Sequence, residues 1–137
     1  MAALLLVGCA SSGVKFSEMA GTLPPPAAGQ GRVYVYRTSA VGAALRPQVT
    51  FDGRVVGKAI PKGFFYVDAA AGSHEIQTST EVTRKLSLTL EPGQVRYVRL
   101  DVSMGFAVGH INPTLVDPAA GAKGIASCHH TTPEAAP

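Results

Sequence analysis

Apolar and polar residues alternate most regularly between residues 82 and 103. The two halves of this stretch, 82–90 and 95–103, each place apolar side chains at every second position. A period of two predicts half-buried strands. A short turn containing Pro92-Gly93 joins the two halves, so the pattern predicts an antiparallel hairpin with one side facing solvent.

A second hairpin is predicted around Asp52-Gly53. Residues 47–51 and 54–59 flank this dipeptide, and the first of these runs alternates in polarity. Asp-Gly is typical of a type I′ turn because both central residues need a positive φ. We therefore expect the two runs to pair closely.

Several further strands follow from the pattern. Residues 32–37 are apolar on both parities between charged ends, which favours a central strand covered on both faces. Residues 64–68 form an aromatic run, and residues 73–80 alternate with His74 on the same parity as Ile76. These features predict two more strands that contribute to the core.

Other segments are less regular. Residues 38–46 fit either a loop or an irregular sheet edge. Glycines and a proline interrupt the apolar run at 104–117, which indicates an edge strand with a bulge or a loop over the core. Residues 118–127 fit one or two helical turns that begin at Pro118.

These elements predict an all-β protein, a small antiparallel β-sandwich with a short C-terminal helical turn. The chain has 137 residues, enough for one domain with a core and too few for two of ordinary size. The run from the aromatic strand through Gly72 into His74 and Ile76 resembles surface modules of the carbohydrate-binding-like or PEGA-like sandwich type. We therefore expect an immunoglobulin-like or PEGA-like sandwich.

The N-terminus carries a different signal. Residues 1–8 are apolar or small and are followed at once by Cys9. This order resembles the lipobox of bacterial lipoproteins, which implies that Cys9 becomes the first mature residue and carries acyl chains such as palmitate. No Lys or Arg precedes the apolar run, so we expect the natural signal peptide to begin upstream of Met1. Acyl chains on Cys9 would attach the protein to a membrane.

The remaining boundaries follow from composition. Residues 9–30 contain many small residues and three consecutive prolines, which predicts a flexible, extended tether. The folded domain is expected over 31–128, and residues 129–137 are expected to form a mobile tail.

The net charge of +3 does not by itself indicate a nucleic-acid partner. Lysines and arginines are spread along the chain with acidic residues between them, whereas binding to a phosphate backbone needs cations gathered on one face. We expect no nucleic-acid partner and no cofactor. A weak attraction to anionic lipid headgroups is compatible with this charge.

Four sequence motifs resemble one family of bacterial lipoproteins. They are Gly-Arg-Val-Tyr-Val-Tyr-Arg at 31–37, Gly-Phe-Phe-Tyr-Val-Asp at 63–68, Leu-Glu-Pro-Gly-Gln-Val-Arg-Tyr-Val-Arg at 90–99 and Leu-Val-Asp-Pro at 115–118. With the lipobox, they are similar to the family catalogued as domain of unknown function 2846. The motifs are strand and turn signatures, so the resemblance implies a compact β-sandwich on a lipid tether and no active residues.

Candidate catalytic residues are few. His74 is interpreted as a partly buried structural residue, whereas His110 could pair with Asp101 or Asp117. Ser103 lacks the glycine that precedes the serine of a nucleophile elbow. Motifs of the His-Glu-x-x-His type and phosphate-binding glycine loops are also missing from the sequence.

The C-terminal residues Cys128, His129 and His130 could bind zinc or copper. Adjacent ligands in a flexible tail lack the loop spacing of closed metal sites. Alternatively, Cys128 is a free thiol, forms an intermolecular disulfide or is buried against the last strands.

The sequence thus favours a noncatalytic lipoprotein of the outer membrane that faces the periplasm and binds an envelope protein or a cell-wall component. The expected contact surface comprises Arg37, Tyr97 and Arg99, which belong to outward parities. The alternative is an envelope hydrolase or metal-handling protein that uses His110 with an aspartate, or the Cys128–His130 segment.

Overall fold

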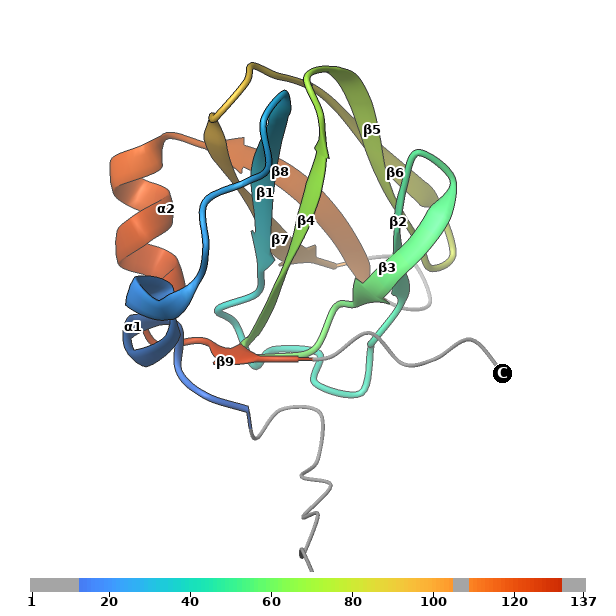
Figure 1. The fold of residues 1–137 in the computed structure, drawn as a ribbon. Coiled ribbons are helices and arrows are strands. Elements are labelled where there is room, and N and C mark those ends of the chain that lie inside the picture. Colours follow the sequence, from blue (N-terminus) through green and yellow to red (C-terminus); the bar gives the residue numbers. More distant parts are fainter. Residues whose placement is uncertain (1–12, 105–108, 132–137) are drawn as a thin grey trace, which may run out of the picture.

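The computed structural model describes residues 13–104 and 109–131 and forms two β-sheets packed face to face (Figure 1). The five-stranded sheet has the order β8-β7-β1-β4-β9, and the four-stranded sheet has the order β3-β2-β5-β6. The strands are β1 (Gln30–Tyr36), β2 (Gln48–Phe51), β3 (Arg54–Lys58), β4 (Gly63–Ala70), β5 (Gly72–Ser79), β6 (Thr83–Leu90), β7 (Val95–Ser103), β8 (His110–Val116) and β9 (His129–His130). The predicted small all-β sandwich is confirmed.

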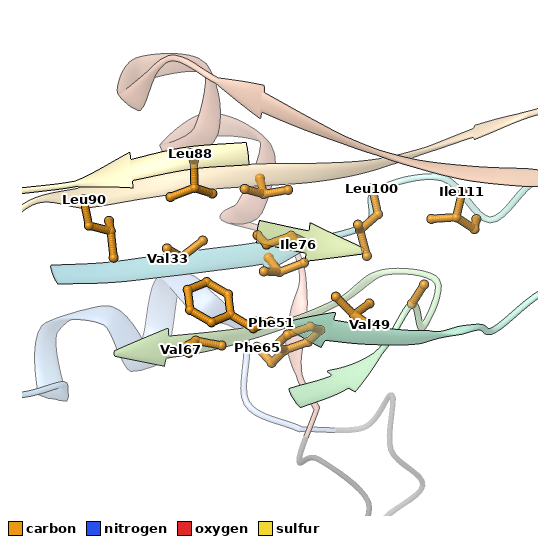
Figure 2. Close-up of a cluster of buried hydrophobic side chains, with 13 residues drawn as sticks. Val33, Val49, Phe51, Phe65, Val67, Ile76, Leu88, Leu90, Leu100 and Ile111 are labelled. Carbon is orange, nitrogen blue, oxygen red and sulfur yellow. The ribbon is translucent and has the colours of Figure 1, made fainter. Parts of the chain in front are cut away.

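The inner faces of the two sheets enclose one apolar core. Figure 2 shows its side chains, which point from both sheets into the space between them. The core comprises Val33, Val35, Val49, Phe51, Ala59, Phe65, Val67, Ile76, Leu88, Leu90, Val98, Leu100 and Ile111. Burial of a large aliphatic or aromatic side chain stabilises a fold by about 1.5–3 kcal/mol, so this layer holds the two sheets together.

The outer face of the five-stranded sheet carries a second apolar cluster. Two short helices, α1 (Phe16–Met19) and α2 (Pro118–Ile125), supply Phe16 and Ile125 to it. The Phe16 ring packs edge-on against Tyr34 and Phe64, with ring centroids 5.0 and 5.2 Å apart. This layer explains why β1 is apolar on both parities, and it confirms the prediction that β1 is covered on both faces.

The predicted hairpin of residues 82–103 is wrong. Strand β6 pairs with β5 in one sheet, whereas β7 pairs with β1 and β8 in the other. The turn at Pro92-Gly93 therefore crosses between the sheets. Alternation identifies which face of a strand is buried but not which strand lies beside it, and both strands direct apolar side chains into the same core.

The Asp52-Gly53 hairpin is confirmed. Strands β2 and β3 pair in antiparallel fashion, and Asp52 and Gly53 have φ values of 52° and 83°. The register shifts between Val49 and Thr50, so one strand of the hairpin is locally irregular.

The C-terminal elements follow the sequence closely. Strand β8 is an edge strand, as one of the two alternatives predicted. The predicted bulge is not formed, because β8 pairs continuously with β7 from His110 to Val116. Helix α2 begins at Pro118, and the Asp117 carboxylate accepts a hydrogen bond from the Ala120 N–H at 2.8 Å. This bond caps the helix. Residues 38–46 form a loop rather than a sheet edge.

The predicted boundaries of the domain need two corrections. The segment assigned to a tether contributes α1, a 3₁₀ turn at Ala20–Thr22 and the buried Phe16. His129 and His130 were expected in a mobile tail but form β9, which pairs with the start of β4 in parallel. The folded unit therefore begins at least 15 residues before residue 31 and includes β9.

Candidate functional site

Arg37 does not belong to a contact surface, contrary to the prediction. Its side chain is fully buried, with 0% of the residue exposed. Its guanidinium donates hydrogen bonds to the carbonyl oxygens of Leu45 and Ala59 at 2.6 Å, and to those of Val41 and Gly42 at 3.0 Å. Burial lowers the pKa of Arg37. The residue thus holds the loop 38–46 against the end of the sandwich.

Tyr97 and Arg99 are only partly accessible. Helix α2 lies over Tyr97, and a Cβ at Gly121 would overlap the Tyr97 ring. Burial raises the pKa of the Tyr97 hydroxyl. Arg99 Nε donates to the Asp101 carboxylate at 2.6 Å, and this bond raises the pKa of Arg99. Sequence parity could not show that a helix would cover the outer face of β7.

His110 is not brought together with Asp101 or Asp117. Its Nε2 lies 2.9 Å from a Glu81 carboxylate oxygen, and its Nδ1 lies 3.2 Å from an Arg84 guanidinium nitrogen. Nε2 thus faces a hydrogen-bond acceptor, and Nδ1 faces a donor. Asp101 binds Arg99 and Asp117 caps α2, so the predicted histidine–aspartate pair is not formed.

The Cys128–His130 segment is packed into the domain. Cys128 is a free thiol that is 1% exposed, and burial raises its pKa to about 11. The His130 ring packs edge-on against Phe64 at 5.3 Å between centroids, and burial lowers the pKa of His130. Within residues 13–104 and 109–131, no group of three or more His, Cys, Asp or Glu side chains is placed to hold a metal ion.

A concave surface site lies where the β2–β3 turn meets the end of β4. This hollow has a volume of about 410 Å³ and is lined by Phe51, Asp52, Arg54, Val67, Asp68, Ala69 and Ala70. Asp52 and Arg54 are exposed at its rim. The hollow therefore presents both signs of charge beside an apolar wall.

His74 fixes one rim of the hollow. Its Nδ1 lies 2.6 Å from the Asp52 carboxylate, and its Nε2 lies 2.6 Å from the Ala70 carbonyl oxygen. Both partners accept hydrogen bonds, so the two ring nitrogens donate and the imidazole is protonated. Burial opposes this charge, but the bonds to Asp52 and Ala70 outweigh it and raise the pKa of His74. The bond from His74 lowers the pKa of Asp52.

Arg32 fixes the opposite rim. Its guanidinium donates two hydrogen bonds to the Asp68 carboxylate, at 2.7 and 3.0 Å. The same guanidinium lies over the Tyr66 ring, 4.6 Å from the centroid. Asp68 raises the pKa of Arg32 further above its ordinary value. Paired bonds of this kind hold a carboxylate in one orientation.

The arrangement is suited to binding rather than to proton transfer. Both carboxylates of the hollow are engaged by fixed cations, and both nitrogens of His74 are occupied by acceptors. Arg54 supplies an exposed positive charge that could meet an anionic group of a partner. The sequence pattern does not reveal the hollow because its residues come from three strands, although the Asp52-Gly53 turn and His74 both stand out in it.

The predicted lipidation site, Cys9, lies outside the described residues. In the described part of the chain, no helix is long and apolar enough to span a membrane.

Comparison with known proteins identifies the family. Residues 27–112, more than half of the chain, match the family described as "Protein of unknown function (DUF2846)". This protein belongs to the DUF2846 family. It is also 33% identical over 127 residues to an uncharacterized protein of Haemophilus influenzae, with 90% of this chain and 76% of that protein covered. No solved structure matches the chain.

Proposed function

We propose that this DUF2846 protein is a noncatalytic lipoprotein of the cell envelope that binds another envelope component through the hollow beside Asp52. In this proposal, acyl chains on Cys9 hold the protein at the outer membrane, and the folded domain faces the periplasm. The sequence Leu6-Val7-Gly8-Cys9 supports the anchor. Several acyl chains bind a bilayer strongly because each buried methylene contributes about 0.8 kcal/mol.

The position of the hollow is the observation that carries the binding function. The Val14 carbonyl accepts a hydrogen bond from His130 of β9, and β9 pairs with the first residues of β4. The hollow is formed by the last residues of the same strand, Asp68 to Ala70. Strand β4 spans the domain (Figure 1), so its first and last residues lie at opposite ends. A lipid attached near Val14 would therefore be at one end, and the hollow at the other end would stay open to a partner.

The structure also supports a noncatalytic function. The candidate catalytic groups of the described residues are tied to structural partners: His74 to Asp52 and Ala70, His110 to Glu81 and Arg84, and Asp117 to the N-terminus of α2. General base catalysis needs a nitrogen or carboxylate that can accept a substrate proton. A binding module needs only a preorganised surface.

The anchor is tested by metabolic labelling with an alkynyl fatty acid. The natural chain should incorporate the label and fractionate with membranes, and Cys9→Ser should do neither. A label retained by Cys9→Ser, or no label on the natural chain, would contradict the anchor.

The binding site is tested by crosslinking in intact cells. A photoreactive amino acid at Ala70, which is exposed in the hollow, should yield a discrete adduct that Arg54→Glu removes. The matched control is the same amino acid at Ser87, an exposed position on the outer face of β6, which should give no such adduct. Equal crosslinking from both positions would contradict binding at the hollow.

A further inference from the structure

Exposed apolar side chains gather at one end of the sandwich. Among the described residues, the large hydrophobic side chains that are exposed are Val14 (53%), Val41 (67%), Met104 (88%) and Val55 (44%). Val55 lies on β3 beside the Asp52-Gly53 turn. The other three lie at the opposite end of the domain.

Backbone contacts place Val14, Val41 and Met104 at the same end. The Val14 carbonyl accepts from the His130 N–H at 2.8 Å, and His130 pairs with Phe64 near the start of β4. The Val41 carbonyl accepts from Arg37, the residue that follows β1. Strand β7 runs parallel to β1 and ends just before Met104. All three residues therefore lie where β1 and β7 end and β4 begins.

Exposed cations lie among these apolar residues. Lys15 forms a backbone bridge with His129, and the His129 N–H donates to the Lys62 carbonyl at 2.8 Å. Lys15 and Lys62 are both exposed and thus flank β9. Arg46 is exposed on the loop that carries Val41. Glu18 of α1 is an exposed carboxylate at the same end, whereas Asp101 and Glu81 are paired with Arg99 and His110. The three cations therefore outnumber the α1 carboxylate.

The described part of the chain begins at this end of the domain, at Gly13. Gly13 lies against the His130 backbone with no room for a Cβ, which fixes the chain at this point. Four residue steps separate Gly13 from Cys9. An extended chain spans at most about 3.6 Å per residue, so the two Cα atoms lie within about 14 Å of each other. A lipid on Cys9 would hold this end of the domain at the bilayer surface.

We propose that this end, defined by Val14, Val41 and Met104 with Lys15, Arg46 and Lys62, rests on an anionic bilayer. The inference depends on the proposed acylation of Cys9, because the lipid supplies the attachment and the surface sets only the orientation. Apolar side chains enter the headgroup region, and the surrounding cations bind anionic headgroups. Each lysine near such a surface favours the docked orientation about fivefold.

The orientation is tested with the acylated full-length protein in vesicles of phosphatidylethanolamine and phosphatidylglycerol that contain brominated lipids. Variants with one added cysteine, Val41→Cys, Met104→Cys and the matched control Val55→Cys, carry an environment-sensitive fluorophore on that cysteine. Native Cys128 is buried and should stay unlabelled. Treating the natural chain, which has no added cysteine, with the same fluorophore verifies this. We expect several-fold stronger quenching at positions 41 and 104 than at 55. Equal quenching at all three positions on protein that stays with the vesicles would overturn the orientation and leave the anchor intact.

The cations are tested in the same system. Lys15→Glu combined with Lys62→Glu should weaken quenching at position 41 in anionic vesicles and leave vesicle retention unchanged. Vesicles without phosphatidylglycerol should show little difference between this variant and its parent. Unchanged quenching in anionic vesicles would overturn the assignment of the surface to anionic lipid. Release of the acylated protein from the vesicles would overturn the anchor and this inference together.

Discussion

The imidazole of His74 connects β5 to Asp52 at the tip of the β2–β3 turn, with 2.6 Å between Nδ1 and the carboxylate oxygen. The ring also stacks on Phe51, with centroids 4.9 Å apart. The side chain of His74 is only 11% exposed, whereas that of Asp52 is 48% exposed. A partly buried cation thus holds one wall of the hollow, and its protonation links the stability of that wall to pH.

The His74–Asp52 pair should give a stability maximum in mildly acidic solution. The folded-state pKa of His74 is raised, so its contribution is complete below about pH 6.5, the unfolded value. It is lost as the pH rises through the folded pKa. The pKa of Asp52 is lowered, so its contribution is present above the unfolded value of about 3.9. It is lost as the pH falls through the folded pKa.

Urea unfolding at a series of pH values measures this dependence. The midpoint of the natural chain should fall as the pH rises from about 6.5 into the alkaline range, because His74 loses its proton. His74→Gln should be less stable at pH 6 and should lose most of this decline. An identical pH profile for the two proteins would contradict a charged His74.

Arg37 should be among the most sensitive positions of the fold. Arg37→Met leaves four carbonyl groups without their donor, of which that of Ala59 is buried and the other three are partly buried. A fully buried unpaired group costs about 1–3 kcal/mol, and partly buried ones cost less because water can reach them. Partial relaxation of the loop at 38–46 should reduce the total to about 3–5 kcal/mol, comparable to the loss of one partner of a buried pair. Denaturant unfolding gives the value directly.

Arg99→Met is the matched control for Arg37→Met. Arg99 is a partly exposed arginine paired with Asp101, and such pairs contribute about 0–1 kcal/mol. Similar losses for the two substitutions would show that Arg37 does not hold the loop.

Arg37 also illustrates what the sequence could and could not predict. The strand before it, β1, and the apolar character of that strand on both faces were predicted correctly, because they depend on residues next to each other in the chain. Its burial was not predicted, since the four carbonyl partners come from residues 41–59 and no local pattern marks a carbonyl as an acceptor. Polarity alone assigned Arg37 to solvent.

Strand partners and helix contacts were also not predicted, because they too depend on residues far apart in the sequence. The turn at Asp52-Gly53 requires positive φ at both residues, so local chemistry fixed that hairpin. The turn at Pro92-Gly93 allows the chain either to fold back or to cross between sheets. Which of the two occurs depends on packing in the core and not on the turn itself. Tyr97 was expected to face solvent because its partner α2 lies more than 20 residues along the chain. The candidate hollow combines two such distant segments, 51–54 and 67–70.

Phe16 should anchor the N-terminal segment to the domain. Its ring is buried between Tyr34 and Phe64, and the Phe16 N–H donates to the Cys128 carbonyl at 2.9 Å. Phe16→Ala removes this ring and should cost about 3–5 kcal/mol if the segment stays in place, or less if it detaches. Limited proteolysis should distinguish the two results, because a detached segment is cleaved near Lys15 in the folded protein.

Val14→Ala is the control for Phe16→Ala, since Val14 is exposed and its loss should change stability by about 0.5 kcal/mol or less. Equal protease sensitivity of Phe16→Ala and the natural chain, with unchanged stability, would contradict a docked segment and favour the tether that the sequence predicted.

Cys128 should be chemically silent in the folded protein. Burial raises the pKa of its thiol to about 11, and the sulfur lies under α2, 3.9 Å from the Gly124 carbonyl oxygen. Only the thiolate reacts with iodoacetamide, so alkylation of the non-acylated Cys9→Ser chain at pH 8 should proceed only through unfolding. Mass spectrometry should therefore find labelling rates that rise with urea in parallel with the unfolded fraction. Phe16→Ala provides a graded comparison, because Phe16 belongs to the same buried cluster as Cys128 and loss of its ring should accelerate labelling before global unfolding. Rapid alkylation of the folded protein without urea would mean that Cys128 is accessible. It would contradict the burial of the thiol under α2.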